Sequence, residues 1–410
     1  MKKIALLLLL PLGLFAQQWQ TLGNPQFVTV DENFGFCGED IASANGNTFI
    51  SFVDEDSNFL SVMRLVNGTW EYVGTPSITE AAGIVELKIT DNNIPYVAFD
   101  TNSGIKVMCF DNNSWITIFN NTQDVFSFDL DNNDIPYITT LDENNNQLVT
   151  QKYNGSFWEE LGNPIQLTTE YDQFALRLSD NNTPYIAFNE DESTVSVNYF
   201  ENNTWVSLPT LEVSDGYFDL EFAGIFDVGP GNIPHLACTK ELEWEGDVHI
   251  YKYLNQNWES IPSPFSQEAA EGGIGIKVTD NNVPYILYDE DFCSDDFYPN
   301  DLIMKKYINE EWVDVGLNCF GYAQAIDGPN FEMDQYGIYF LEKTHVQDEY
   351  SLTTLWYPLG GVNMDEEKEN TSKELLKIVD VLGRNVKPTA NTPLFYIYQD
   401  GSMSKQFIIE

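Results

Sequence analysis

The stretch "TDNNIPYVAFD", Thr90–Asp100, decides the fold because close copies of it recur along the chain. Two of them are "SDNNTPYIAFN" at 179–189 and "TDNNVPYILYD" at 279–289. Further copies surround Pro136 and Pro234, and weaker copies surround Phe49 and Tyr339, which brings the total to seven. In the clearest copies a turn of Asn and Asp residues, which accept positive φ angles, precedes a proline, which tolerates the first position of a strand. The repeated block therefore predicts a β-hairpin that serves as scaffold.

A second landmark recurs at a similar spacing, a tryptophan that opens a short strand. Its seven copies are Trp19, Trp70, Trp115, Trp158, Trp205, Trp258 and Trp312. The mean interval of about 49 residues is in the range of a four-stranded propeller blade. Because these aromatic residues recur in every unit, we expect them to pack between units rather than to stack on sugars. We predict an all-β, seven-bladed β-propeller, with eight blades as the alternative.

The phase of the repeat predicts how the ring closes. Trp19 begins a fourth strand that has no first three strands before it. At the other end, "YSLTTLWYPLGG" at 350–361 reads as a third strand with no fourth strand after it. The N-terminal strand would therefore complete the last blade and remove the open sheet edges. We place the propeller at residues 17–359.

The first sixteen residues have the pattern of a secretory signal peptide. Lys2 and Lys3 form a basic start, Ile4–Phe15 is apolar, and Ala16 is a small residue before the expected cut. The apolar run is too short to span a bilayer, and no other segment approaches the required length. We expect residues 1–16 to be removed and the mature chain to carry no transmembrane segment.

The C-terminal region differs in composition from the body. A polar linker at 360–373 precedes residues 374–410, which alternate like a small antiparallel β unit. Within this unit, "LLKIVDVLGR" at 375–384, "NTPLFYIY" at 391–398 and "DGSMSKQFIIE" at 400–410 resemble the type A C-terminal sorting domain of the type IX secretion system of Gram-negative bacteria.

This resemblance implies a small β-sandwich-like sorting domain in which Gly383 and Arg384 belong to the recognised motif. It implies that the chain crosses the inner membrane by the general secretory route and the outer membrane through the type IX machinery. The sortase of that system would remove the tail. The body would then be released or attached to the outer-membrane surface of a Gram-negative bacterium.

The charge of the chain is strongly one-sided. The formal net charge is −45, and the region between the signal and Val362 holds 11 basic and 56 acidic residues. Such a surface repels nucleic acid and attracts cations or basic partners. An acidic solvated surface that keeps a monomer soluble is the simpler interpretation.

The phase of the repeat also predicts where a ligand would bind. With the first strand of each blade innermost, the loops that follow the second strands share one face, and these loops are acidic. We predict a ligand-binding face for a glycan, a cation-bridged ligand or a basic protein patch, formed by Asp54, Asp100, Glu190, Asp289, Glu290 and Asp291.

The longest of these loops, 289–301, is the candidate metal site. Clustered carboxylates suit a hard cation such as Ca²⁺, although the spacing does not follow the EF-hand pattern and a solvated loop is the alternative. The candidate ligands are Asp289, Asp291, Asp295 and Asp296. The chain has five cysteines, so at least one thiol has no partner within it, and Cys293 and Cys319 would lie on one face as a disulfide.

Evidence for catalysis is sparse. The body has only two arginines, Arg64 and Arg177, and no recognised nucleophile or metalloprotease motif. His235 and His249 would face each other in the fifth blade, with His235 as a packed residue. We expect a secreted or cell-surface binding or adhesion protein. The alternatives are a polysaccharide-active hydrolase or lyase that uses funnel carboxylates, and a structural surface protein.

Overall fold

The computed structural model divides the chain into two compact units, Met1–Gly361 and Val362–Glu410. It describes residues 18–30, 38–54, 57–81, 83–169, 173–191, 193–213, 216–217, 225–242, 245–263, 275–290, 300–317, 320, 322–323, 331–346, 349–359, 375–379, 393–398 and 403–407. All regular structure that these residues form is β-strand.

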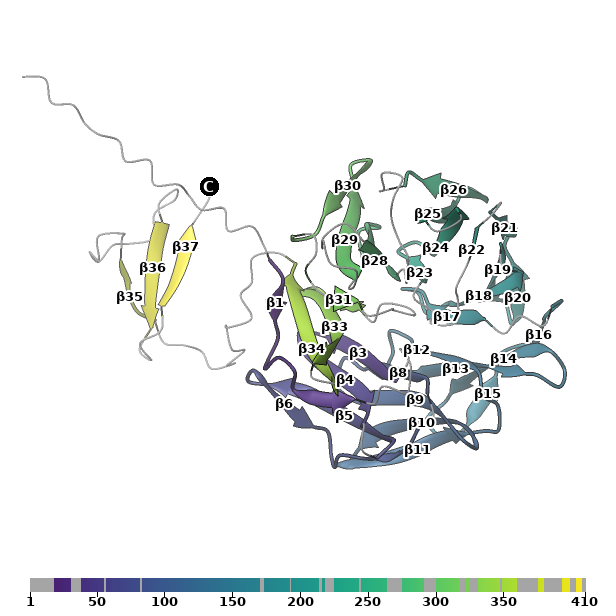
Figure 1. Ribbon diagram of the computed structural model, residues 1–410, viewed down its shortest axis with the longest axis horizontal. Coiled ribbons are helices and arrows are strands. Elements are labelled where there is room, and N and C mark those ends of the chain that lie inside the picture. Colours follow the sequence, from purple (N-terminus) through teal and green to yellow (C-terminus); the bar gives the residue numbers. More distant parts are fainter. Residues whose placement is uncertain are drawn as a thin grey trace, which may run out of the picture. The chain divides into compact units, whose positions relative to one another are not determined.

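The first unit is a ring of seven antiparallel sheets (Figure 1). Blades 1 to 4 comprise β3 (Glu39–Ala44), β4 (Asn47–Val53), β5 (Phe59–Val66) and β6 (Thr69–Tyr72); β8 (Val85–Ile89), β9 (Pro95–Thr101), β10 (Gly104–Asp111) and β11 (Ser114–Asn120); β12 (Phe126–Leu130), β13 (Pro136–Asp142), β14 (Gln147–Tyr153) and β15 (Trp158–Glu160); and β17 (Phe174–Leu178), β18 (Pro184–Asp191), β19 (Thr194–Glu201) and β20 (Thr204–Ser207).

Blades 5 to 7 follow the same order. They comprise β22 (Gly216–Tyr217) with β23 (Phe226–Gly229), β24 (Ile233–Leu242), β25 (Glu245–Leu254) and β26 (Asn257–Ile261); β27 (Gly275–Val278), β28 (Pro284–Glu290), β29 (Asn300–Ile308) and β30 (Glu311–Asp314); and β32 (Phe331–Met333), β33 (Gly337–Val346), β34 (Glu349–Pro358) and β1 (Gln20–Thr21). Short strands that pair with third strands are β2 (Val28–Val30), β7 (Thr79–Glu80), β16 (Ile165–Gln166), β21 (Leu211–Glu212) and β31 (Tyr322–Ala323).

The first strand of each blade lies at the axis, where it contacts the first strands of both neighbouring blades. These contacts run from β3 around the ring to β32, which contacts β3 again. The predicted seven-bladed propeller is therefore confirmed, and the eight-bladed alternative is excluded.

The predicted closure by the N-terminal strand is also confirmed. β1 pairs antiparallel with β34, with Gln20 opposite Trp356 and Thr21 opposite Leu355. β2 extends the pairing to the other end of β34. Blade 7 is thus built from both ends of the propeller sequence, so that no blade is left without its fourth strand.

The repeated "TDNN" block forms the turn between the first and second strands. In blade 2 the Thr90 hydroxyl accepts a hydrogen bond from the Ile94 amide at 3.0 Å, and the Asn93 amide donates to the Thr90 carbonyl at 2.9 Å. Asn93 has a φ of 62°, a left-handed conformation that Asn adopts more readily than most residues. Pro95 then begins β9. The block is a turn, as its composition predicts.

The tryptophans connect neighbouring blades. The indole N–H of Trp115 donates to the carbonyl of Val73 in blade 1 at 2.8 Å, and that of Trp158 donates to Ile118 in blade 2 at 2.8 Å. The same bond to the preceding blade is made by Trp205, Trp258, Trp312 and Trp19. Trp70 is the exception, because its buried indole nitrogen has no hydrogen-bond partner.

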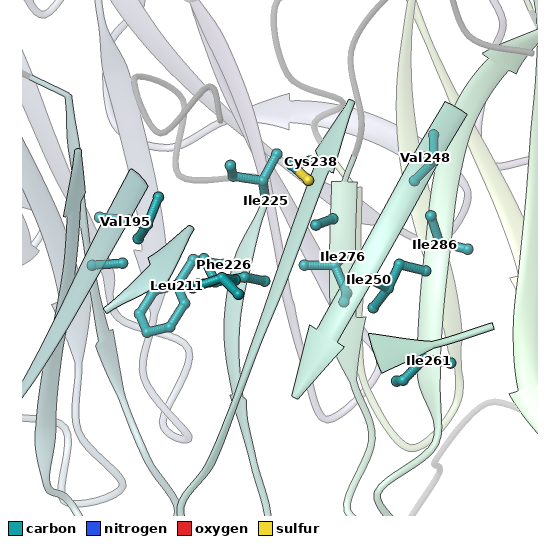
Figure 2. Packing of buried hydrophobic residues seen from close by; sticks show 14 of the residues in the cluster. Val195, Leu211, Ile225, Phe226, Cys238, Val248, Ile250, Ile261, Ile276 and Ile286 are labelled. Atoms are coloured by element: carbon teal, nitrogen blue, oxygen red, sulfur yellow. The ribbon is translucent and has the colours of Figure 1, made fainter. Parts of the chain in front are cut away.

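Apolar side chains fill the space between adjacent sheets (Figure 2). Between blades 4 and 6, one buried cluster joins Val195, Phe226, Ile250 and Ile286 from successive sheets. Cys238 lies in this cluster, and Cys109 is a buried thiol of blade 2. Burial between blades rather than in one central core is what a ring of sheets requires.

The second unit contains a three-stranded antiparallel sheet in the order β35 (Leu375–Val379), β36 (Pro393–Tyr398) and β37 (Met403–Phe407). Gly383 and Arg384, the residues of the expected sorting motif, lie outside the described residues.

The inter-blade tryptophan bond is testable with a matched pair of variants. Trp115→Phe removes the hydrogen bond between the indole and the preceding blade, whereas Trp70→Phe removes an indole that makes no such bond. Both variants lose the same ring volume beside an aromatic neighbour. We expect Trp115→Phe to lower the free energy of unfolding by about 1 kcal/mol more than Trp70→Phe does, as measured by denaturant unfolding. Equal losses would contradict a stabilising role for the bond.

Candidate functional site: a carboxylate rim and an axial charge ring

Four successive blades place a carboxylate where the second strand ends. Asp54 follows β4, Asp100 lies near the end of β9, Asp142 ends β13, and Glu190 lies near the end of β18. We call these four residues the carboxylate rim and this end of the blades the rim end. The "TDNN" turns lie at the opposite end, the turn end. The structure therefore brings Asp54, Asp100 and Glu190 to one end of the propeller, as the sequence predicts.

Two members of the rim are held by hydroxyl groups of their own blade or, for Thr168, of the connection from blade 3 to blade 4. Ser61 Oγ donates to Asp54 Oδ2 at 2.6 Å. Ser196 Oγ donates to Glu190 Oε1 at 2.8 Å, and Thr168 Oγ1 donates to the other carboxylate oxygen. These bonds fix the orientation of both side chains and occupy part of their capacity to accept hydrogen bonds.

Asp100 differs from the other rim members. Its Oδ1 atom is buried without a hydrogen-bond partner, although the residue as a whole is partly exposed. Burial raises the pKa of Asp100 to about 6, and hydrogen bonds from the backbone amides of Asp100, Ile84 and Gly83 lower it only in part. Asp100 is thus a partly desolvated carboxyl group at the rim end, with one oxygen buried and the residue as a whole partly exposed.

The remaining predicted site residues lie wholly, or in their side chains, outside the part of the chain that the structure describes. Asp289 and Glu290 end β28, but their side chains lie outside the described residues. Asp291, Asp295 and Asp296, together with the expected disulfide partners Cys293 and Cys319, also lie outside them. Within the described part of the chain, no group of three or more His, Cys, Asp or Glu side chains is placed to hold a metal ion.

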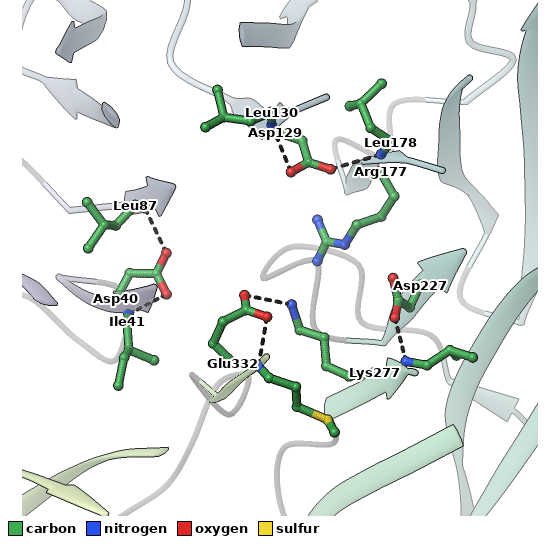
Figure 3. Close-up of polar contacts among 12 residues, drawn as sticks. Asp40, Ile41, Leu87, Asp129, Leu130, Arg177, Leu178, Asp227, Lys277 and Glu332 are labelled. Carbon is green, nitrogen blue, oxygen red and sulfur yellow. Dashed lines mark hydrogen bonds and ion pairs between the residues drawn. The ribbon is translucent and has the colours of Figure 1, made fainter. Parts of the chain in front are cut away.

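A feature that we did not predict lies at the axis. Each first strand contributes the residue that lies opposite the aromatic or histidine residue near the start of its second strand. Together these residues form a ring around the axis. In ring order its residues are Lys88, Asp129, Arg177, Asp227, Lys277, Glu332 and Ala42. Positive and negative side chains alternate around six blades, and we call these six charged residues the axial ring. Figure 3 shows five of them converging from different strands.

The charges of the axial ring interact across blades. Lys277 Nζ and Glu332 Oε2 form an ion pair at 3.1 Å. Burial raises the pKa of Glu332, but Lys277 and Lys88 outweigh it and the pKa lies below its ordinary value. Burial alone would lower the pKa of Lys88. The negative charges of Asp129, Asp40 and Glu332 have the larger effect, so the pKa of Lys88 lies above its ordinary value. Both residues are therefore held in their charged forms.

Carboxylates at the axis also bond one blade to the next. Asp129 Oδ2 accepts from the amide of Leu178 in blade 4 at 2.8 Å, and Asp227 Oδ2 accepts from Val278 in blade 6 at 2.6 Å (Figure 3). Asp40 in blade 1 accepts in the same way from the next first strand. Each bond supplies an acceptor to a backbone N–H that faces the neighbouring blade, where no strand pairs with it.

Glu86, in blade 2, makes the same kind of bond but is electrostatically less favoured. Its Oε2 accepts from the amide of Phe128 at 2.9 Å. Burial raises the pKa of Glu86 to about 7, Lys88 and Arg177 lower it in part, and Asp40 raises it further. Carboxylates thus outnumber the cations around Lys88, and burial raises the pKa of both Glu86 and Asp40.

The sequence carried a signal for the axial cations. "LKITDNN", "LRLSDNN" and "IKVTDNN" place Lys88, Arg177 and Lys277 at the same distance before the turn. The basic residues of alternate blades can be recognised only when the units are aligned on the first strand. Spacing along a single strand does not show that these side chains meet.

The expected pairing of the two histidines is wrong. His235 lies opposite Lys252, and His249 lies opposite Cys238, so the two rings are three register positions apart on the hairpin. His235 is buried, its Nδ1 is 2.9 Å from the carbonyl oxygen of Ile233, and burial lowers its pKa to about 4. His235 is the packed histidine that its place in the repeat predicts.

The described residues form no helix that is long and apolar enough to cross a membrane. No protein-family model matches the sequence, and no curated protein matches it.

Similar solved structures share the architecture at low sequence identity. The polysaccharide lyase Uly1 is 8% identical with a TM-score of 0.52, and the match covers 82% of this chain and 93% of that chain. A PL25 ulvan lyase is 14% identical with a TM-score of 0.50, and the match covers 82% and 94%. A fucose-specific lectin from Aleuria aurantia is 12% identical with a TM-score of 0.42, and the match covers 72% and 99%. Identities this low show a shared fold alone.

The protonation of Glu86 predicts how stability depends on pH. Between pH 4.5 and about 7 the unfolded carboxyl group is ionised while the folded one is still largely protonated, so the contribution of Glu86 to stability falls as the pH rises. Glu86→Gln does not titrate and keeps an acceptor for Phe128. Above pH 7 we expect the variant to exceed the wild type in free energy of unfolding by about 1–3 kcal/mol.

Denaturant unfolding over that pH range is the measurement. The stability difference between variant and wild type should shrink as the pH falls toward 4.5. A difference that does not change with pH would contradict the raised pKa of Glu86.

Proposed function

We propose that the protein is an exported β-propeller that binds a glycan at its carboxylate rim. The observation that carries the proposal is the carboxylate rim, in which four successive blades each place a carboxylate at the end of the second strand, with Asp100 partly exposed among them. Ionised carboxylates are strong acceptors and suit the adjacent hydroxyl groups of a sugar.

The rest of the rim supports binding by a rigid surface. The carboxylates of Asp54 and Glu190 are already oriented by Ser61 and Ser196 of their own blades and by Thr168 of the connection from blade 3 to blade 4. A preorganised surface loses little conformational entropy when a ligand binds. The fold adds a reason to begin with carbohydrates, because two propellers of similar architecture bear the names of polysaccharide lyases.

A polysaccharide-active enzyme is the alternative function. A glycosidase would need two carboxyl groups on either side of one glycosidic bond. Asp54 and Glu190, two of the rim carboxylates, are engaged by hydroxyl groups of their own blades, which favours a binding role for them. Incubation of the protein with each bound polysaccharide, followed by analysis of chain length, separates the two functions.

We also propose that the protein reaches the cell surface or the medium through the type IX secretion system. The support is the signal-like start and the resemblance of residues 374–410 to a type A sorting domain. The body would be the exported functional domain, and the second unit would be its sorting signal. A protein that acts outside the cell is consistent with a glycan ligand.

The glycan proposal predicts a loss of binding on a conservative change. Asp100→Asn removes the charge but keeps the size, and we expect at least a tenfold weaker affinity for the bound glycan, about 1.4 kcal/mol. Asp111→Asn, at the turn end of the same blade, is the matched control and should bind as the wild type does. Glycan-array screening followed by calorimetry measures both.

Two results would contradict this proposal. One is the absence of binding to every glycan on the array together with concentration-dependent self-association, which would favour a structural surface protein. The other is equal glycan affinity of the wild type and Asp100→Asn.

The export proposal predicts where truncated chains accumulate. In a Gram-negative host with a working type IX system, removal of residues 362–410 should leave the propeller in the periplasm, and Arg384→Ala should reduce its amount outside the cell. Immunoblots of periplasm, surface and medium measure this. Normal export of the truncated chain would overturn the assignment.

A further inference from the structure

The few cations of the body are distributed unevenly, and this distribution limits the class of ligand. Eleven basic residues accompany 56 acidic ones between the signal and Val362. Three of the eleven, Lys88, Arg177 and Lys277, belong to the axial ring, where they alternate with carboxylates. Lys277 pairs with Glu332 of the next blade, and Lys88 interacts electrostatically with Asp129, Asp40 and Glu332.

Five further cations lie toward the turn end of third strands. They are Arg64, Lys152, Lys252, Lys305 and Lys306, each opposite one of the first few residues of a second strand. Lys305 Nζ is 2.5 Å from Asp314 Oδ1. Lys152 lies 5.1 Å from the centre of the Tyr137 ring, and Lys306 lies 5.8 Å from that of Tyr285. A ligand at the rim end is therefore at the other end of the blades from these charges.

Three cations remain toward the rim end. The side chain of Lys343 is only 11% exposed, and its Nζ pairs with Glu39 Oε1 at 3.4 Å. Lys106 follows Ile105, the residue opposite Asp100, and therefore projects from the other face of that sheet. The side chain of Lys240 lies outside the described residues. The rim end thus combines four rim carboxylates with a buried, neutralised lysine and a lysine that faces away from Asp100.

We propose that the carboxylate rim selects a neutral glycan and excludes polysaccharides that carry carboxylate or sulfate groups. This inference rests on the proposed glycan binding and gives it a substrate class. An acidic polymer would place its charges against like charges that no described cation of the rim offsets, which raises the free energy of the complex and slows the encounter. Hydroxyl groups of a neutral sugar meet acceptors instead of like charges.

The experiment compares three classes of polymer on the full mature protein. Binding of a neutral glucan or galactan, an acidic alginate or sulfated galactan, and a cationic deacetylated amino-sugar polymer is measured at low and high ionic strength. Wild type, Asp100→Asn and Lys106→Met are compared, because Lys106 is the described cation that an acidic polymer could reach at the rim end.

The expected result is binding of a neutral polymer that varies little with salt, weakens at least about tenfold in Asp100→Asn and is unchanged in Lys106→Met. Acidic polymers should bind at least about tenfold more weakly than the neutral one even at low salt.

Three results would overturn the inference. Tight binding of an acidic polymer that Lys106→Met abolishes would overturn the substrate class while leaving glycan binding intact. Binding of the cationic polymer alone, lost at high salt and unaffected by Asp100→Asn, would show unspecific charge attraction. Failure of all three classes to bind would overturn the glycan proposal and this inference with it.

Discussion

Closure of a ring of seven separate sheets is the constraint on which the rest of the structure depends. Each sheet is short, so every blade must be fixed to the blades on both sides of it. At the outer edge, an indole N–H donates to a backbone carbonyl of the preceding blade, as Trp158 does to Ile118 at 2.8 Å. At the axis, a carboxylate accepts a backbone N–H of the following blade, as Asp129 does from Leu178. Apolar clusters fill the space between these two levels.

The axial bonds have an electrostatic consequence. Carboxylates brought together near an axis repel one another, and partial burial makes that repulsion stronger than in water. The chain offsets it with Lys88, Arg177 and Lys277 on alternate blades, although only 11 cations are present among 56 acids in the body. The offset is incomplete near blade 2, where Glu86 has a pKa of about 7. Cations placed at the axis are not available at the rim end, and the proposed preference for a neutral glycan follows from the same arrangement.

Much of the fold could be predicted from the sequence because local chemistry repeats. The turn at Thr90–Asn93, the proline that starts β9 and the tryptophan that opens β11 each have a local cause, and their period gives seven blades. The unmatched strand at Trp19 even predicts which strand closes the ring. The rim follows from the same phase, since it needs only the position at which each second strand ends.

The axial ring could not be predicted in this way. Lys88 and Asp129 are 41 positions apart in the sequence and meet only because the ring curves their strands toward one axis. A lysine within an alternating strand ordinarily indicates a solvent-facing position. The prediction that the two histidines face each other is wrong for a related reason. The register of the hairpin depends on the length of the connection between its strands, and it places His249 opposite Cys238. The bonding state of Asp100 likewise depends on the neighbouring loop at Gly83 and Ile84.

The central claim is that ligand recognition occurs at the rim end and not at the axis. A structure of the protein with a bound neutral oligosaccharide tests it most directly. The account predicts density for the sugar at the rim end of blades 1 to 4, with a hydroxyl group within hydrogen-bond distance of the Asp100 carboxyl group. Density for the sugar at the axis against Lys88 and Arg177, or at the "TDNN" turns, would contradict it.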